Sequence, residues 1–342
     1  MPQKSGQYSS SIGVLCFALI IVNAPIHAQL THNKPLVIAH RGASGYVPEH
    51  TLAAAAMAYA QGADFIEQDV VLTKDGIPVV IHDIYLDLTT NVREVFPHRA
   101  RADGKWYVID FTVEEIKTLR VTERRDPSTE AAAFPNRFPV GKSSFTIPTL
   151  AEEIELIQGL NSSTGKNVGI YPEIKKPAFH TQEGYDLGKI VLDMLAEYGY
   201  QGPEAKVFVQ CFEPDYTHRL RQELGTQLPL IQLIGPGHVS DLLTTAAGLN
   251  LIASYANGIG PALSRIVSEK TGETGRISDL VVQAHARGLV VHPYTFRRDE
   301  LPPYIHYFDE LIRLFFFDIG VDGGFTDFPD IMNHVLFQGR KH

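Results

Sequence analysis

The fold of this chain is decided by residues Leu36–Asp83, which read LVIAHRGASGYVPEHTLAAAAMAYAQGADFIEQDVVLTKDGIPVVIHD. Two histidines, His40 and His82, each come directly after a short apolar run, and Glu67 and Asp69 lie on a third run between them. Short apolar runs bounded by polar residues are typical of buried strands. Groups that can bind a metal or move a proton are therefore predicted at the ends of strands.

The two central residues of the turn before His82 are Asp75 and Gly76, the strongest short-range signal for a β-hairpin. A two-residue loop would place Asp69 opposite His82, with Glu67 on the same face of its strand. We therefore expect two carboxylates and an imidazole to converge. The alternative, a solvated strand face, is disfavoured because the residues flanking both carboxylates are apolar.

Length and charge narrow the classes of protein. With 342 residues, 44% of them hydrophobic, the chain can bury one barrel-sized core or two smaller ones. It carries 39 acidic and 30 basic side chains, and no stretch forms a basic stripe. Nucleic acid is therefore not expected as a partner.

Residues 1–28 have the pattern of a secretory signal peptide, with Lys4 before a mostly apolar segment from Ile12 to Asn23 and a small residue, Ala28, at its end. This predicts a periplasmic protein without stable membrane insertion after cleavage; a retained N-terminal anchor is the alternative. Only Cys211 of the two cysteines would then remain, so no intrachain disulfide is expected, and we interpret Cys211 as a buried core thiol.

From Leu36 onward, β-rich runs alternate with amphipathic stretches. The predicted strands are Leu36–His40, Asp64–Val70, Val168–Ile174, Val207–Phe212, Pro229–Ile234, Leu251–Tyr255, Leu289–Tyr294 and Gly323–Thr326, with Pro78–His82 as the return arm of the hairpin. Predicted helices between them include Thr51–Gln61, Leu150–Gln158, Tyr185–Tyr198, Asp215–Leu224 and Ile277–Arg287. Eight such units predict a (β/α)8 TIM barrel over residues 29–342; a doubly wound open sheet is the alternative.

One interval, about residues 84–146, breaks this alternation. It is rich in charge and proline and shows little periodicity. A loop of that length within a compact domain usually has structure of its own. We expect a small insertion subdomain after the hairpin of the second strand, lying over the end of the barrel where His82 is placed.

Glu173 and Lys175 extend the candidate site, because alternate residues of a strand share one face. Active sites of barrel enzymes collect at the C-terminal ends of the strands, where Glu67, Asp69 and Glu173 all fall. Three carboxylates without a thiolate favour Ca²⁺ or Mg²⁺ over structural zinc. Arg41 and Lys175 remain as cations for an anionic substrate, and a planar guanidinium beside a metal suits a phosphate.

The chain resembles the glycerophosphodiester phosphodiesterase family, and its periplasmic bacterial branch most closely. The similarity rests on the order and spacing of several short motifs: His40-Arg41-Gly42, Pro48-Glu49-His50-Thr51, Glu67-Gln68-Asp69, His82-Asp83, Glu173-Ile174-Lys175, Gln210-Cys211-Phe212, Tyr255 to Pro261, Val291 to Thr295, and Phe325 to Asp330. The general family pattern has Asn where this chain has His50, a position expected to brace its loop.

The resemblance implies a TIM barrel with an insertion and hydrolysis of deacylated phospholipids to sn-glycerol 3-phosphate and an alcohol. It also implies one divalent cation, usually Ca²⁺ in the periplasmic branch, with Mg²⁺ as the alternative. We expect His40 and His82 to be the general acid and base and Glu67, Asp69 and Glu173 to bind the metal. The predicted substrate contacts are Arg41, Lys175, Phe212 and Tyr255, although core packing is an equal alternative for the two aromatic residues.

Three other groups are not expected to take part in the chemistry. His292 is expected to be a structural histidine, Glu49 and His50 a helix cap, and Gly258–Pro261 a turn. The alternatives to hydrolysis are a lyase that makes a cyclic phosphate and a binding protein built on an inactive barrel. The sequence leaves a homodimer open.

Overall fold

The computed structural model describes residues 1–2, 34–268 and 275–339. The predicted signal peptide over residues 1–28 therefore lies almost entirely outside the described residues and stays a prediction. No helix in the described part of the chain is long and apolar enough to cross a membrane.

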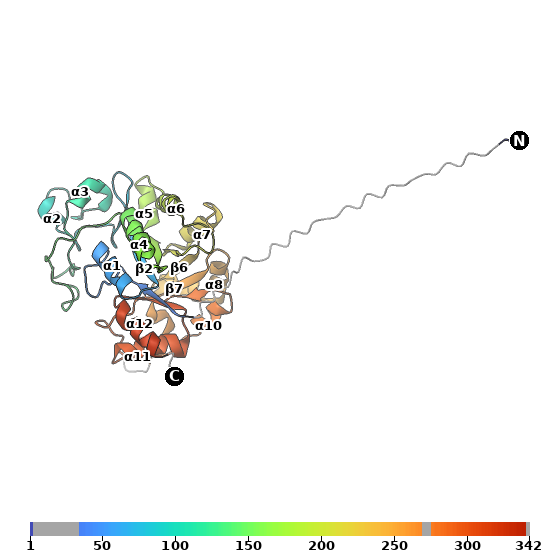
Figure 1. Ribbon diagram of the computed structural model, residues 1–342. Helices are drawn as coiled ribbons and strands as arrows, with labels where there is room; N and C mark the ends of the chain where they lie inside the picture. The colour runs from blue at the N-terminus through green and yellow to red at the C-terminus, as the bar shows by residue number, and fades with distance from the viewer. Residues whose placement is uncertain (3–33, 269–274, 340–342) are drawn as a thin grey trace.

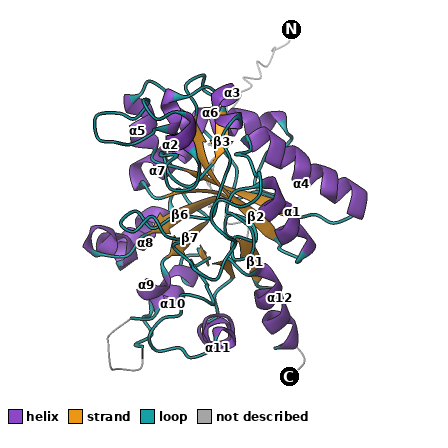
Figure 2. Ribbon diagram, turned by 90° about the vertical axis from the view of Figure 1, so that its left-hand side faces the viewer, coloured by secondary structure: helices purple, strands orange, loops and turns teal. Residues whose placement is uncertain are grey.

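Eight parallel strands form a barrel with helices around it (Figures 1 and 2). The order around the barrel is β1, β2, β4, β5, β6, β7, β8 and β9, and β3 pairs with β2 alone, antiparallel to it. The strands are β1 (Leu36–Ala39), β2 (Phe65–Leu72), β3 (Pro78–Val80), β4 (Gly169–Ile174), β5 (Val209–Cys211), β6 (Leu230–Ile234), β7 (Gly258–Pro261), β8 (Val290–Val291) and β9 (Gly323–Thr326). The predicted (β/α)8 barrel is confirmed.

Backbone hydrogen bonds join the two ends of this strand order. The amide of Asp322 donates to the carbonyl of Val291 at 3.1 Å, and the amide of Phe325 donates to the carbonyl of Pro293 at 3.0 Å. Pro293, just beyond the short strand β8, has no N–H to donate back to β9. These bonds nearly close the sheet, so the alternative of an open doubly wound sheet is excluded.

Helices connect and cover the strands, and many begin at residues suited to capping. Thr149 accepts from the amide of Glu152 at the start of α4, and Glu152 bonds back to Thr149, forming a capping box. The helices are α1 (Leu52–Ala60), α2 (Val92–Val95), η1 (Val108–Asp110), α3 (Val113–Lys117), α4 (Leu150–Thr164), α5 (Pro177–Gln182), α6 (Leu187–Glu197), α7 (Pro214–Gln222), η2 (His238–Thr244), α8 (Ala246–Ala253), α9 (Leu263–Ile266), α10 (Leu280–His285), α11 (Phe308–Arg313), the π-helical η3 (Leu314–Ile319) and α12 (Pro329–Gln338).

Apolar side chains fill two layers. The barrel interior holds a cluster that includes Phe65, Tyr171, Phe208 and Phe325, whose rings pack edge-on, tilted or stacked. A larger cluster lies between the outer faces of the strands and the helices. Cys211 is buried in this outer layer, as expected for a core thiol.

One predicted strand is wrong. Residues from Leu251 onward end helix α8, and the strand that follows is β7, which we had interpreted as a turn because of its glycines. A Cβ at Gly258 would lie 2.4 Å from the Cγ2 of Val290, and one at Gly260 would lie 2.6 Å from a methyl group of Leu233. The glycines of β7 are therefore needed for close packing within the barrel wall.

The predicted register of the hairpin is also wrong by one residue. Val70 pairs with Val80, so the connecting loop is longer than two residues, and the amide of Ile81 donates to the carbonyl of Asp69 at 2.9 Å. Gly76 has a positive φ of 76°, whereas Asp75 lacks the positive φ that a type I′ turn requires. His82 thus lies just beyond β3 rather than opposite Asp69.

The interval from residue 84 to 146 contains α2, η1 and α3 and has an apolar cluster of its own. That cluster includes Trp106, Phe111 and Ile116 and continues onto Val71 and Val79 of the hairpin. Figure 1 shows α2 and α3 to one side of the barrel. We call residues 84–146 the insertion.

A buried carboxyl group behind β2 gives a prediction on stability. Glu153 of α4 is 2% exposed; its Oε1 accepts from Gln68 Nε2 at 2.9 Å, and its Oε2 has no hydrogen-bond partner among the described residues. Burial raises the pKa of Glu153 to about 7, against the opposing effect of Gln68. The folded protein thus binds this proton more tightly than the unfolded chain, so the contribution to stability is complete below the unfolded pKa and is lost as pH rises through 7.

We expect Glu153→Gln to change stability little at pH 5 and to raise the free energy of unfolding by roughly 2–3 kcal/mol at pH 8, because an amide keeps the bond to Gln68 without a charge. Urea unfolding at both pH values measures this, with the exposed Glu197→Gln as control. An equal effect of Glu153→Gln at the two pH values would contradict the prediction.

Candidate active site

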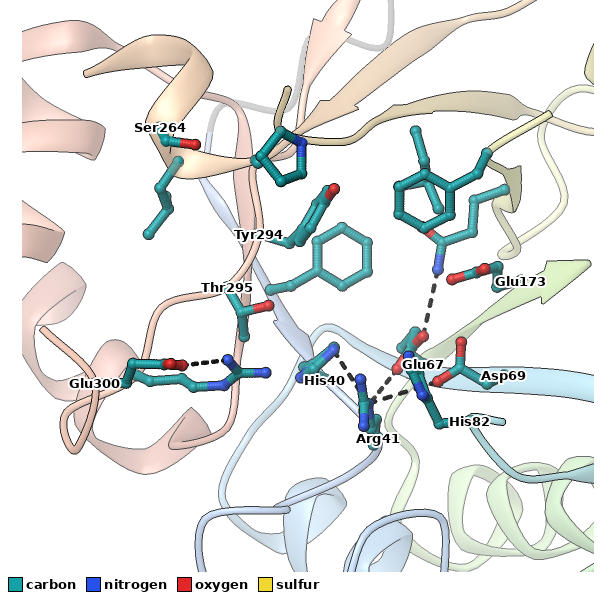
Figure 3. A pocket seen from close by; sticks show the side chains of 18 of the residues that line it. His40, Arg41, Glu67, Asp69, His82, Glu173, Ser264, Tyr294, Thr295 and Glu300 are labelled. Carbon is teal, nitrogen blue, oxygen red and sulfur yellow. Dashed lines mark hydrogen bonds and ion pairs between the residues drawn. The ribbon is translucent and has the colours of Figure 1, made fainter. Parts of the chain in front are cut away.

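A cavity of about 440 Å³ opens at the C-terminal ends of the barrel strands. Figure 3 shows His40, Arg41, Glu67, Asp69 and His82 gathered on one side of it, with Ser264, Thr295 and Glu300 on the other. Of the predicted site residues, those that line the cavity are His40, Arg41, Glu67, Asp69, His82, Glu173, Lys175 and Phe212. The structure therefore brings together residues from β1, β2, β4 and β5 and from the end of the hairpin.

His40 follows β1, and its ring is fixed by Asp327, which follows the neighbouring strand β9. The Nδ1 atom of His40 lies 2.6 Å from Asp327 Oδ1. Burial acts to raise the pKa of Asp327, but Arg297, His40 and Arg137 hold it well below its usual range. The carboxylate is ionised, so His40 donates from Nδ1 and keeps the lone pair on Nε2.

The charge state of His40 is set by its surroundings. Burial and Arg41 lower the pKa of His40 to about 4, although Asp327 acts in the opposite direction. The Nε of Arg41 lies 3.3 Å from His40 Nε2. His40 is thus a neutral imidazole at pH 7 with an Nε2 that can accept a proton.

His82 has a similar arrangement. Its Nδ1 lies 2.8 Å from Asp83 Oδ1. Burial opposes ionisation of Asp83, but the hydrogen bond from His82 and the charge of Arg124 hold the pKa of Asp83 below its usual range. Burial, Arg41 and Lys175 lower the pKa of His82. A second neutral imidazole therefore lines the same cavity, although 30% of its side chain is exposed.

Arg41 is held in place by acidic groups on three sides. Its backbone φ is 59°, and its amide donates to Glu67 Oε2 at 2.7 Å. Its guanidinium donates to both oxygens of Glu49 at 3.0 Å and lies 3.6 Å from Asp69 Oδ2. Arg124 of the insertion also binds Glu49. Arg41 thus presents a fixed positive charge at the cavity wall.

The buried acidic groups differ in their tendency to ionise. Burial and the charge of Asp69 raise the pKa of Glu67 well above its usual value, and burial raises that of Glu173 to about 8. Burial opposes ionisation of Asp69, but Lys175 and other positive neighbours hold its pKa well below the usual range. Lys175 Nζ lies 2.9 Å from Glu173 Oε1 and 3.3 Å from Asp69 Oδ1. This concentration of buried acidic groups fits a cation.

His50, Glu67 and Asp69 form a compact group that could hold a metal ion, since one ligand atom of each lies within 4.8 Å of the others. The predicted group had Glu173 in the place of His50, and the compact group does not include Glu173. His50 Nε2 lies 2.7 Å from Asp69 Oδ2. The donor set of two carboxylates and an imidazole suits a divalent cation.

From the sequence, His50 was expected to lie outside the site as part of a helix cap. Thr51 is the actual cap of α1, because its Oγ1 accepts from the amide of Ala54 at 3.1 Å. His50 has a φ of 57°, in the left-handed region where His and Asn are enriched. The Asn of the general family pattern at this position was the signal that pointed to a polar, left-handed residue.

Of the two aromatic residues predicted to contact the substrate, one lines the cavity and the other does not. Phe212 lines the cavity and is 39% exposed, with Lys175 Nζ 5.9 Å from its ring centre. Tyr255 is 3% exposed, does not line the cavity, and donates its hydroxyl to Gln232 Oε1 at 3.1 Å. The structure therefore does not bring Tyr255 to the site, because it belongs to the segment after α8 rather than to a strand end. Tyr294 lines the cavity instead.

Two polar residues of the cavity, Gln210 and Arg297, were not predicted from the sequence. Gln210 of β5 lines the cavity, its Nε2 lies 3.5 Å from Glu67 Oε1, and its Oε1 has no hydrogen-bond partner within the described residues. Arg297 lines the cavity and binds Asp327.

His292 is fully buried and bonded through Nδ1 to Tyr171 at 2.9 Å, in keeping with a structural role.

Comparison with known proteins finds a matching family and several relatives. The model of the "Glycerophosphoryl diester phosphodiesterase family" matches residues 40–331. A glycerophosphodiester phosphodiesterase of Haemophilus influenzae is 41% identical, covering 89% of this chain and 90% of the relative. One of Treponema pallidum is 38% identical, covering 90% and 93%.

A crystal structure from Silicibacter pomeroyi, provisionally described as a glycerophosphoryl diester phosphodiesterase, is 25% identical and superimposes with a TM-score of 0.69 over 90% of this chain and 95% of that one. The family match covers the barrel from β2 to β9 and all the cavity residues discussed above, from His40 to Phe325. This chain belongs to the glycerophosphoryl diester phosphodiesterase family.

Proposed function

We propose that this protein hydrolyses glycerophosphodiesters, such as glycerophosphocholine and glycerophosphoethanolamine, to sn-glycerol 3-phosphate and an alcohol. The observation that carries the proposal is the pairing of two carboxylate-bound imidazoles with fixed cations in one cavity. His40 and His82 supply the imidazoles, and Arg41 and Lys175 supply the cations. The Haemophilus influenzae and Treponema pallidum relatives, both described as glycerophosphodiester phosphodiesterases, support the substrate class.

Proton transfer is assigned to the two histidines. Each donates from Nδ1 to an ionised aspartate, so Nε2 is the nitrogen that can exchange a proton with the reacting groups. In His40 this nitrogen accepts from Arg41 Nε at 3.3 Å, and that long bond has to open when the substrate binds. One, as a neutral imidazole, takes the proton of the attacking glycerol 2-hydroxyl at Nε2. The other first takes a proton from solvent at Nε2, as an imidazolium bound to its aspartate, and gives that proton to the departing alkoxide. The resulting cyclic phosphate is opened by water while the two imidazoles exchange roles.

The phosphate is bound by Arg41, whose position is fixed by Glu49 and Glu67, and by Lys175. Phe212 offers an apolar surface beside Lys175 for the glycerol backbone. A net charge of −9 and the small size of the cavity favour a small molecule over nucleic acid.

A divalent cation, Ca²⁺ or alternatively Mg²⁺, fits the acidic groups, and we propose Glu67, Asp69 and Glu173 as its protein ligands. His50 is then the group that orients Asp69, because the proton it shares with Asp69 Oδ2 occupies its Nε2. When bound, the cation would stabilise negative charge that develops on the phosphate oxygens.

The assay that tests the function is incubation with glycerophosphocholine and Ca²⁺ followed by ³¹P NMR. We expect glycerol 3-phosphate as the final product. A cyclic phosphate that accumulates would favour the lyase, and the absence of any product would favour a binding protein. The same incubation with His40→Ala and His82→Ala controls for contaminating phosphodiesterases.

A periplasmic location is part of the proposal and rests on the sequence pattern of residues 1–28. N-terminal sequencing of the protein recovered from a periplasmic fraction should begin just after Ala28. Recovery of the full-length chain from membranes would favour the retained anchor instead.

A further inference from the structure

Asp327 is the centre of a charge cluster directly behind His40. Its two carboxylate oxygens have separate partners. Oδ1 bonds to His40 Nδ1 at 2.6 Å, whereas Oδ2 accepts from Arg137 Nη2 at 2.7 Å and from Arg297 Nε at 2.8 Å. Only 1% of the Asp327 side chain is exposed. Because the two arginines bind Oδ2, the plane of the carboxylate is fixed and Oδ1 is directed at the histidine.

Arg137 differs from Arg297 in origin and in access to the cavity. Arg137 comes from the insertion, 190 residues before Asp327 in the chain, and it is not among the residues that line the cavity. Arg297 lines the cavity and also pairs with Glu300 at 2.5 Å, so it can meet a bound molecule directly. Arg137 therefore acts on the reacting groups through its partners, and of these Asp327 is the one that binds the ring of His40.

The Arg137 side chain is held on every side, which indicates a built contact rather than a surface ion pair. It donates Nε and Nη2 to the two oxygens of Asp299 at 2.8 and 3.0 Å and Nη1 to the carbonyl of Ser44 at 3.3 Å. Its guanidinium carbon lies 3.8 Å from the ring centre of Phe134. Only 5% of the side chain is exposed. One residue of the insertion thus joins the loops after β1 and β8 to the end of β9.

We propose that Arg137 is a positioning residue for the reaction: through Asp327 it holds His40 with Nδ1–H bound and Nε2 directed at the cavity, which makes the insertion part of the catalytic centre. The inference rests on the proposed function, because it requires His40 to transfer a proton. It goes further by assigning a catalytic requirement to a segment outside the barrel.

The physical reason is the orientation of a charged pair. A carboxylate that binds Nδ1–H selects the tautomer of a histidine and stabilises the imidazolium formed when Nε2 takes a proton. Without Arg137, Oδ2 would keep only Arg297, whose guanidinium also serves Glu300. The carboxylate could then turn, and His40 would lose its fixed direction.

The test compares Arg137→Ala with Arg120→Ala, which removes an exposed arginine of the same insertion. We expect Arg137→Ala to lower kcat by about 10- to 100-fold, the usual cost of losing a group that orients a functional histidine, with KM for glycerophosphocholine nearly unchanged. Arg120→Ala should have wild-type kinetics. Guanidinium ion added to Arg137→Ala should restore part of kcat, and Arg137→Lys should be intermediate.

Double mutants separate positioning from general damage. If Arg137 acts through His40, adding Arg137→Ala to His40→Ala should lower kcat no further. A full additional loss in that background, or a rise in KM with kcat unchanged, would overturn the inference. If circular dichroism shows that Arg137→Ala does not fold, the same comparison is made with Arg137→Lys. Normal turnover by His40→Ala would instead overturn the proposed function, so the two failures are distinguishable.

Discussion

Replacing His40 or His82 with alanine is expected to lower kcat by about 10²- to 10⁴-fold while leaving the affinity for a divalent cation nearly unchanged. Each imidazole lines the cavity and is held through Nδ1 by an ionised aspartate, so its Nε2 is the group that meets the substrate. Neither His40 nor His82 belongs to the compact group of His50, Glu67 and Asp69, so cation binding should be retained. Steady-state kinetics and calorimetric titration with Ca²⁺ measure the two effects.

A matched control is His98→Ala, which removes an exposed histidine of the insertion and should leave kcat unaltered. Near-normal turnover by both His40→Ala and His82→Ala would contradict the assignment of the pair. A substrate that lacks the glycerol 2-hydroxyl tests the route separately, because near-normal turnover of that substrate would exclude the cyclic intermediate.

The pH profile follows from the same environment. Burial lowers the pKa of both histidines, that of His40 to about 4. The imidazole that acts as base is lost as pH falls through its pKa, so the decline of kcat/KM toward low pH should lie below about pH 5 rather than near 6.5. Wild-type kcat/KM measured from pH 4 to 8 tests this, and a decline centred near 6.5 would mean that the essential imidazole is not the buried, neutral group described here.

The barrel and much of its site could be predicted because both depend on local patterns. Buried parallel strands give short apolar runs, and the C-terminal ends of neighbouring parallel strands lie together. This is why His40, Glu67 and Glu173, which are far apart in the chain, were correctly expected in one cavity. Strand β7 was not predicted. Its glycines are needed for close packing against Val290, and composition alone does not reveal such a contact.

The errors at the site have a different origin. The hairpin register depended on a loop that is longer than two residues, and a slip of one residue moves a side chain to the other face of a strand. His82 nevertheless reaches the cavity because it lies beyond the end of β3. The contact of Arg137 with Asp327 joins residues 190 positions apart through a loop without periodicity, so no local pattern could have indicated it.

Removing the divalent cation is expected to abolish activity, and Glu67→Gln is expected to weaken cation binding by at least about tenfold, since even partners outside the ligand set commonly cost that much. Glu67 and Asp69 offer ligand atoms close together, and burial raises the pKa values of Glu67 and Glu173. Glu173 therefore retains its proton at pH 7 without a cation, and the pKa of Glu67 is shifted in the same direction. Ca²⁺ binding should release protons into a weakly buffered solution, and Glu67→Gln should release fewer.

The third ligand is decided by a matched pair of variants. Because the Nε2 of His50 shares a proton with Asp69, His50→Asn should reduce Ca²⁺ affinity less than Glu173→Gln does. The reverse order would place the imidazole in the ligand set and Glu173 outside it. Glu197→Gln, on the exposed end of α6, is the control for loss of an acidic group. Normal turnover by a chelator-treated, metal-free sample would contradict metal dependence itself. The buried acidic groups at this cavity would then be functional without a bound cation.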